Sequence, residues 1–291
     1  METPNLYPLS IGEILDRAFR LYRRHFGLLI GITLVGYMPM TVLQIISFFT
    51  FQGSSFISLI QTGFVSLLVT GALTVAISDL YLGDSVTMKE AYQEIWQRYG
   101  SAWGGQFLLG LFITIPLILV ASGLLFFMSI QNRWTTFIVL LVLVPVFIFL
   151  ITRWSMMLPA ILLESCRAKE GLDRSWILTK GFFWRVFGTT FLAGLLVYIF
   201  SALPQFALTY GIEFFVSGSS YGPLLQTIFS QVALIFASPI STGVNVILFY
   251  DILVRKEGFD LALQLNNDSP QTLLEKPSEK EEPYDYVNNP W

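Results

Sequence analysis

Six long apolar blocks dominate this sequence and restrict what it can fold into. Each is roughly as long as the 20 residues that an α-helix needs to cross a hydrocarbon core of about 30 Å. Only 13% of the residues are charged, against about a quarter in ordinary soluble domains. A soluble fold of 291 residues could not bury so much apolar surface. We therefore expect an all-α fold, a polytopic six-helix transmembrane bundle over residues 27–51, 56–82, 106–130, 135–151, 187–208 and 224–253.

Lys and Arg lie mainly on one side of these predicted spans. They precede span one, separate spans two and three, separate spans four and five, and follow span six, whereas the opposite connections contain only Arg133. Because short loops rich in Lys and Arg stay on the cytoplasmic side, we expect both termini in the cytoplasm. The predicted location is the cytoplasmic (inner) membrane.

The chain divides into three predicted parts. Residues 1–26 form an amphipathic cytoplasmic helix, and residues 27–259 form the membrane domain, with interfacial helices near 86–100 and 167–183. Residues 260–291 are acidic and rich in Pro, Ser and Glu. Such a segment cannot bury enough apolar surface to offset the entropy of ordering, so we expect a disordered cytoplasmic tail.

Three segments of the sequence begin alike. Glu13, Glu90 and Glu170 are each followed by an aromatic residue six positions later and another thirteen positions later. Pro39 and Pro116 share one offset, and Pro159 and Pro239 share another. We interpret this as three parallel repeats, each an amphipathic helix followed by a transmembrane hairpin. The alternative is chance similarity among interfacial helices.

Ionisable residues inside or near the spans form the first candidate site. Asp79, Glu164 and Asp251 fall toward the cytoplasmic ends of spans two, four and six, and Arg153 lies near the same level. Such groups are costly in a membrane and are usually paired or functional. We expect Arg153 to neutralise one or two of the acids. The pairing either sets helix register or belongs to a transport path.

Span six carries a second candidate site. It has a proline, a glycine and hydrogen-bonding side chains near mid-membrane: Ser238, Pro239, Ser241, Thr242, Gly243 and Asn245. Proline removes a backbone donor and frees a carbonyl. These residues indicate either a broken helix lining a small-molecule or lipid path, or a tight packing seam of small residues.

The basic residues of the leading helices are candidate contacts for membrane lipids with anionic head groups. They are Arg17, Arg20, Arg23, Arg24, Arg174, Lys180 and Arg185. Ordinary anchoring by positive charge on the cytoplasmic side is the alternative explanation.

The sequence argues against several classes of chemistry. With one histidine, His25, and one cysteine, Cys166, it cannot build the usual His/Cys zinc sites or a Cys–His dyad. It has no phosphate-binding G-x-x-x-x-G-K-[ST] motif. We expect no metal, no cofactor, no nucleic-acid partner and no catalytic residue.

Three stretches resemble a known family. They are Pro-Leu-Ser-Ile-Gly-Glu-Ile-Leu-Asp-Arg from Pro8, Leu-Pro-Ala-Ile-Leu-Leu-Glu from Leu158 leading to Asp-Arg-Ser-Trp at Asp173, and Phe-Tyr-Asp-Ile-Leu-Val-Arg from Phe249. The chain resembles the membrane-domain family of glycerophosphodiester phosphodiesterases over nearly its whole length except the tail. The resemblance implies a membrane module and not the phosphodiesterase, whose separate barrel uses paired histidines and metal-binding carboxylates.

Two function classes follow. The first is a non-enzymatic anchor, scaffold or accessory at the cytoplasmic membrane face, with a protein partner bound through the cytoplasmic helices or the tail. The alternative is a transporter or lipid-translocating protein with a path between the hairpins. An intramembrane hydrolase is disfavoured because no nucleophile and base are recognisable.

Overall fold

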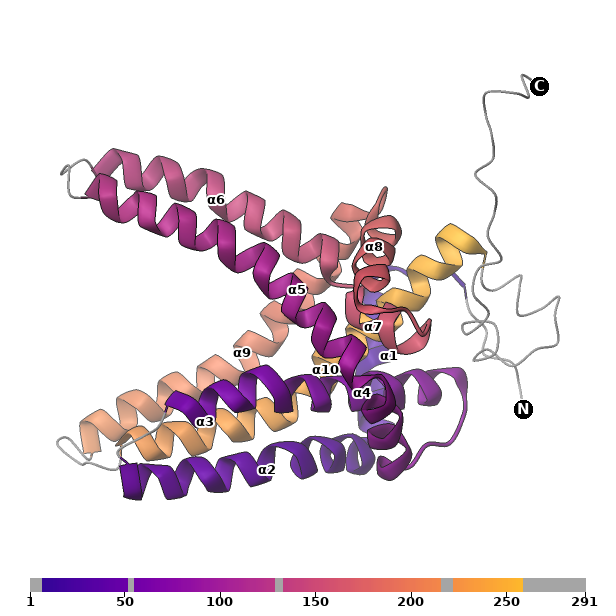
Figure 1. Cartoon of the computed structure of the whole chain (residues 1–291). Helices are drawn as coiled ribbons and strands as arrows, with labels where there is room; N and C mark the ends of the chain where they lie inside the picture. Colours follow the sequence, from indigo (N-terminus) through magenta and orange to yellow (C-terminus); the bar gives the residue numbers. More distant parts are fainter. Residues whose placement is uncertain (1–6, 52–54, 129–132, 216–221, 259–291) are drawn as a thin grey trace.

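The computed structural model describes residues 7–51, 55–128, 133–215 and 222–258, and every regular element in these ranges is helical (Figure 1). The predicted tail, residues 260–291, lies outside the described residues. The elements in order are α1 (Ile11–Arg24), α2 (Phe26–Phe51), α3 (Ser55–Ile60), η1 (Gln61–Val65), α4 (Ser66–Leu82), α5 (Met88–Met128), α6 (Arg133–Trp154), α7 (Met157–Leu163), α8 (Ala168–Thr179), α9 (Phe183–Phe215) and α10 (Gly222–Glu257).

The N-terminal helix α1 is short and amphipathic. Ser10 and Glu13 form a capping box at its start: the Glu13 main-chain N–H donates to Ser10 Oγ, and the Ser10 N–H donates to Glu13 Oε2 at 2.6 Å. Its buried side, including Ile14 and Ala18, packs against α10. The helix ends at His25, where the chain turns into α2. Of the predicted helical segment 1–26, α1 occupies Ile11–Arg24.

The long helix α2 buries one side and exposes an apolar stripe on the other. Val35, Met38, Val42 and Ile46 recur at helical spacing and are 47–60% exposed, whereas Tyr37 on the opposite side is 2% exposed. In water such a stripe would be costly, but in a bilayer it faces hydrocarbon. The exposed pattern is that of a lipid-facing helix.

The second predicted span is built from α3, η1 and α4 in direct succession. The turn between the two α-helices is a π-helix over Gln61–Val65. Such turns are rare and widen the helix by one residue. The span ends at Gly83, whose φ of +93° is readily adopted only by a residue without a side chain.

Four helical stretches are long and apolar enough to cross a membrane: Phe26–Thr50, Ile57–Leu82, Val144–Leu163 and Leu224–Glu257. The pair Ala168–Thr179 and Phe183–Ile199, bent by 104°, adds a fifth if it is counted as one span. These counts apply to the described residues alone. The structure thus confirms an all-helical fold with several spans, and the number six stays a prediction.

The three leading segments share their first turn but differ afterwards. In each, the glutamate Oε2 accepts the main-chain N–H three residues earlier: Ser10 at 2.6 Å, Thr87 at 2.8 Å and Arg167 at 2.9 Å. However, α5 runs without interruption from Met88 to Met128, so the helix predicted near 86–100 is not separate from its span. Shared capping accounts for part of the sequence likeness, and the threefold repeat stays a prediction.

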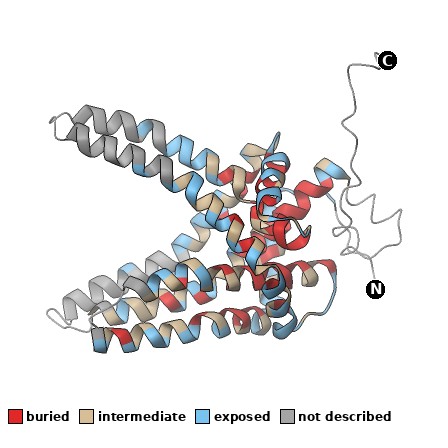
Figure 2. Ribbon diagram, viewed as in Figure 1, coloured by how far each residue is buried: buried red, intermediate tan, exposed pale blue. Residues whose placement is uncertain are grey.

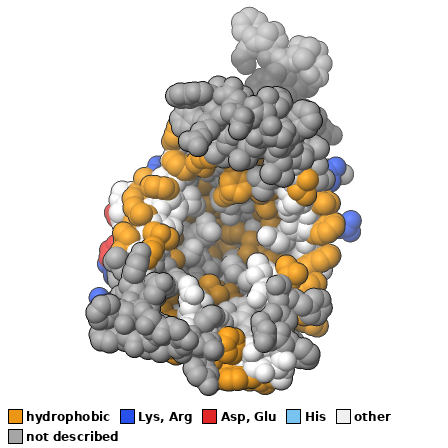
Figure 3. Space-filling view, turned by 90° about the vertical axis from the view of Figure 1, so that its left-hand side faces the viewer, with side chains coloured by type: hydrophobic (Ala, Val, Ile, Leu, Met, Phe, Trp, Pro, Cys, Tyr) orange, Lys and Arg blue, Asp and Glu red, His pale blue; other side chains and the backbone are white. Residues whose placement is uncertain are grey.

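The buried core lies at one end of the molecule. Figure 1 shows α5 and α6 diverging from α2, α9 and α10 at one end and meeting them at the other, beside α1, α7 and α8. Buried residues concentrate where the helices meet (Figure 2), in α4, α7 and the second half of α10. Figure 3 shows the face of the molecule that lies on the left in Figure 1. Its coloured surface is largely hydrophobic, with Lys and Arg at the edges.

Candidate functional site

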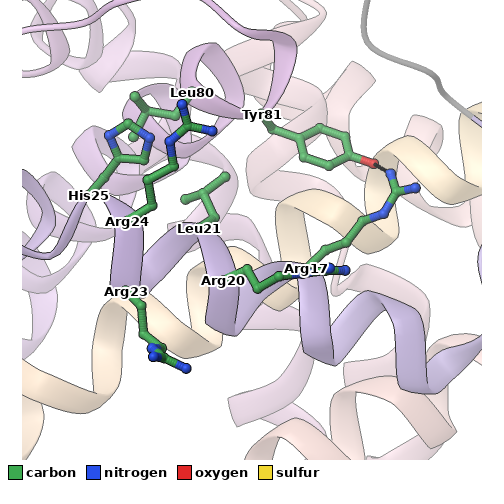
Figure 4. A pocket seen from close by; sticks show the side chains of 8 residues that line it. All are labelled: Arg17, Arg20, Leu21, Arg23, Arg24, His25, Leu80 and Tyr81. Carbon is green, nitrogen blue, oxygen red and sulfur yellow. Dashed lines mark hydrogen bonds between the residues drawn. The ribbon is translucent and has the colours of Figure 1, made fainter.

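A cavity of about 770 Å³ lies where α1 passes the end of α4 (Figure 4). We call it the basic pocket; its lining is Arg17, Arg20, Leu21, Arg23, Arg24, His25, Leu80 and Tyr81. Arg17, Arg20 and Arg24 fall at positions i, i+3 and i+7, which share one side of a helix. The periodicity of α1 thus gathers several positive charges around one concave surface.

The arginines of the basic pocket differ in how firmly they are held. Arg17 donates from Nη1 to the Tyr81 hydroxyl at 3.0 Å, and its guanidinium lies 4.7 Å from the Tyr7 ring centroid. Arg20 pairs with Asp16 at 2.7 Å, but both side chains are at least 60% exposed, and such a pair contributes little. Arg23 and Arg24 are exposed. Figure 4 shows Arg24 and His25 beside Leu80, with Arg23 extending from the other side of α1. The pocket can therefore offer several guanidinium groups to an anion.

His25 is the titratable group of this pocket. Partial burial and the adjacent positive charge of Arg24 lower its pKa below the usual 6.5. It is therefore largely neutral near pH 7, and it gains a positive charge only under more acidic conditions. Binding an anion in the pocket would oppose this shift.

Asp251 is the centre of a buried ion-pair cluster. Its side chain is completely buried and lies 2.8 Å from Arg185 Nε and 3.1 Å from Arg255 Nε. Asp251 Oδ1 also accepts the main-chain N–H of Leu9 at 2.7 Å. The Leu9 carbonyl accepts hydrogen bonds from both arginines. This cluster fastens the segment before α1 to α9 and α10.

Glu164 belongs to a second cluster. Arg174 holds it through two hydrogen bonds, Nε to Oε2 at 2.6 Å and Nη2 to Oε1 at 2.7 Å. The same guanidinium binds Glu257 at 2.6 and 2.8 Å. Bidentate pairing of this kind is strong and geometrically specific. Arg174 therefore links the loop after α7, helix α8 and the end of α10.

The prediction that Arg153 pairs with the acids is wrong for Asp251 and Glu164. Arg153 lies instead against aromatic rings, 4.7 Å from the centroid of Trp176 and 5.2 Å from that of Phe149. Arg174 and Arg185 supply the charges because the α8–α9 bend brings them back onto α10, a path that sequence position does not reveal. Asp79 is half-buried near the end of α4, where its carbonyl accepts the Asp84 N–H at 2.9 Å.

Of the two interpretations of span six, the broken helix does not match the structure. Helix α10 is continuous from Gly222 to Glu257, with Pro239 inside it. Thr242 Oγ1 donates to the Ser238 carbonyl at 2.9 Å. A Cβ placed on Gly243 would lie 3.6 Å from the Ala18 Cβ, so α1 approaches α10 closely at this glycine. Neighbouring Ser241 is exposed and Asn245 half-buried. The contact at Gly243 favours the interpretation as a packing seam.

Three glutamines form a polar cluster that our sequence analysis did not single out. Gln44 of α2 donates to Gln61 Oε1 at 2.5 Å, and Gln61 donates to Gln231 Oε1 of α10 at 2.8 Å. Gln231 donates back to Gln44 Oε1 at 3.1 Å. Each of the three glutamines interrupts an apolar block of the sequence. Our sequence analysis considered ionisable residues in the spans and therefore missed these uncharged amides. The ring joins three spans through interhelical hydrogen bonds.

The structure divides the seven predicted lipid-contacting cations into two groups. Arg17, Arg20, Arg23 and Arg24 line the basic pocket. Arg174 and Arg185 are paired with the carboxylates of the two ion-pair clusters, whereas Lys180 is exposed at the end of α8. Among the described residues, no group of three or more His, Cys, Asp or Glu is placed to hold a metal ion.

Helices of this length, with lipid-facing apolar stripes and charges gathered at one end, define an integral membrane protein of the all-α class. A family model for the membrane domain of glycerophosphoryl diester phosphodiesterase matches residues 125–283, more than half of the chain, and the chain belongs to this family. The match includes two of the resembling stretches, and the one at Pro8 lies outside it. No curated protein and no solved structure matches the chain.

Proposed function

We propose that this protein is a non-enzymatic membrane module that binds anionic phospholipid head groups at the cytoplasmic face of the inner membrane, and that it anchors or scaffolds a partner there. The basic pocket carries this proposal: four arginines and a histidine line one cavity beside the first span. Guanidinium groups present planar donor pairs that match phosphate oxygens. The leading helix α1 is amphipathic, as expected for a helix in the head-group layer.

The orientation is part of the same proposal. The basic pocket is lined by α1 and α4, and Arg174 belongs to α8. Figure 1 shows α1, α4 and α8 where the long helices converge. An excess of positive charge at one end of a membrane protein favours a cytoplasmic location for that end. Anionic lipids of the cytoplasmic leaflet attract basic residues by about 1 kcal/mol for each charge near the surface.

The lack of enzymatic activity is proposed on chemical grounds. Burial raises the pKa of the Cys166 thiol to about 11, so the thiolate is scarce near neutral pH. Purified protein assayed with a glycerophosphodiester should release no alcohol above the rate of heat-denatured protein. Hydrolysis that follows the folded protein would contradict the proposal.

The translocation alternative is weakened by the ion pairs. It rested on acids converging near a broken sixth span, whereas Asp251 and Glu164 are held by arginines and α10 is continuous. Carboxylates paired with arginines in this way do not provide open positions for a substrate.

The head-group proposal is tested by measuring lipid enrichment. The full chain is extracted from mixed vesicles of phosphatidylglycerol and phosphatidylcholine, and the co-purifying lipids are quantified by mass spectrometry. The paired substitution Arg23→Gln/Arg24→Gln should reduce phosphatidylglycerol enrichment by up to about 30-fold, since two charges contribute roughly 2 kcal/mol. Lys89→Gln/Lys169→Gln, which removes two exposed charges elsewhere, should change it far less. Equal effects of the two variants would refute a specific site.

A further inference from the structure

A second cavity lies on another side of α1. It has a volume of about 300 Å³ and is formed by α1, α9 and α10. Aromatic and aliphatic side chains line it, among them Phe19, Tyr22, Leu196, Phe229, Ala233 and Ala237. We call it the apolar pocket. Its volume is at the lower end of the range of about 300–1,000 Å³ that is typical of small-molecule sites.

The small side chains of α10 create the apolar pocket. Ala233 and Ala237 are one helical turn apart and leave a depression beside larger neighbours. Farther along α10, helices α1 and α10 approach each other at Ala18 and Gly243. On another side, the ring of Phe26 stacks on Phe236 with centroids 6.2 Å apart. The first contact holds α1 close to α10, and the second places the start of α2 against α10.

The apolar pocket opens toward the lipid-facing surface. Val232 and Phe236 on its rim are 42% and 45% exposed. Both belong to the Leu224–Glu257 stretch that is long and apolar enough to cross a membrane. A hydrocarbon chain can therefore enter from the bilayer without crossing water.

The two pockets share α1 as a common wall. Phe19 and Tyr22 line the apolar pocket, and Arg20 and Arg23 line the basic pocket. The Arg23 side chain extends from the other side of α1 than Arg24 (Figure 4). Since successive residues are about 100° apart on a helix, Arg23 is displaced from Phe19 by only about 40° around the axis. A phosphate bound at Arg23 is thus beside the rim of the apolar pocket. A ligand that fits both has an anionic head and a hydrocarbon chain.

We propose that the apolar pocket takes one acyl chain of a phospholipid whose phosphate is bound by Arg23 at the edge of the basic pocket. This inference rests on the proposed head-group function and adds a defined place for the chain. The protein would then hold a single phospholipid across α1, with its head on the cytoplasmic side of the helix and one chain between α9 and α10.

The test is lipid retention by the detergent-purified full chain, measured by native mass spectrometry. Dioleoyl phosphatidylglycerol and dioleoyl phosphatidylcholine are the two probes, because they share chains and differ in charge. Ala233→Trp places a large side chain in the apolar pocket, and Ala237→Leu occupies a smaller part of its volume. Ile46→Trp on α2, where Ile46 is 52% exposed, is the matched control. Size-exclusion chromatography and circular dichroism establish that each variant is folded.

The wild-type chain should retain one phosphatidylglycerol. Folded Ala233→Trp should lose about tenfold in retention of both probes, because each methylene removed from contact costs about fourfold in the binding constant. Ala237→Leu should lose less, and Ile46→Trp less than twofold. Arg23→Gln should lower retention of phosphatidylglycerol to the phosphatidylcholine level.

Two results separate the possible failures. If folded Ala233→Trp and Ala237→Leu retain both lipids like the wild type while Arg23→Gln does not, the acyl-chain pocket is refuted and the head-group site stands. If the filled variants lose both lipids equally while Arg23→Gln/Arg24→Gln keeps its preference for phosphatidylglycerol, the head-group site is refuted and the chain pocket stands.

Discussion

The Asp251 carboxylate accepts the main-chain N–H of Leu9 at 2.7 Å, across 242 positions of sequence. This bond places the start of α1 against α10 and so fixes where the basic pocket forms. Both ion-pair partners of Asp251, Arg185 and Arg255, bind the Leu9 carbonyl as well. Asp251 and its two arginines therefore fix the segment before α1 relative to α9 and α10.

Replacing Asp251 should destabilise the protein strongly. Asp251→Asn removes a completely buried negative charge and leaves Arg185 and Arg255 without their anionic partner. Removing one member of a buried ion-pair cluster costs about 3–5 kcal/mol. Thermal unfolding in detergent measures the loss. Asp16→Asn, which breaks an exposed pair with Arg20, should cost less than about 1 kcal/mol, and similar losses for both would contradict the role given to Asp251.

The glutamine ring should stabilise the contact between α2, the second span and α10. Gln61→Leu leaves Gln44 and Gln231 without a shared partner and should reduce the free energy of unfolding by about 1–2 kcal/mol. Adding Gln231→Leu should cost less than the sum of the two single changes, because both act on one network. Gln106→Leu, at an exposed position of α5, provides the control. Strictly additive losses would argue against the ring.

A side chain at Gly171 should not be tolerated without rearrangement. A Cβ there would lie 2.3 Å from Ile161 Cγ1 of α7 and 3.5 Å from the Met157 carbonyl. We expect Gly171→Ala to lower stability by about 1–3 kcal/mol despite the better helix propensity of alanine. Gly194 of α9 has nothing within 4 Å of such an atom, so Gly194→Ala should be neutral or stabilising. A melting temperature at or above wild type for Gly171→Ala would show that α7 and α8 can move apart.

Binding of anionic lipid should strengthen as the pH falls. Burial and Arg24 lower the pKa of His25 below 6.5, so the ring gains its charge only below that pH, while a phosphodiester head group stays anionic. Retention of phosphatidylglycerol relative to phosphatidylcholine should therefore rise between about pH 7 and pH 5. His25→Gln should abolish the rise. Because the chain has one histidine, a pH response that persists in the variant would place the titrating group elsewhere.

Several features of this protein follow from sequence alone. The apolar blocks predict membrane helices because a backbone in hydrocarbon must satisfy its hydrogen bonds within a helix. The amphipathic pattern of residues 1–26 predicts α1 for an equally local reason. The gathering of Arg17, Arg20 and Arg24 on one side of that helix is likewise a property of its period.

Only the tertiary structure decided which helices meet and which charges pair. Arg185 and not Arg153 reaches Asp251, because the chain turns by 104° between α8 and α9 at a short connection around Gly181. The amide ring of Gln44, Gln61 and Gln231 likewise depends on three spans lying together. Local sequence determines whether a segment is a helix and which side is polar. Side-chain contacts between segments far apart in the chain depend on packing, because several pairings of the same apolar helices bury similar surface.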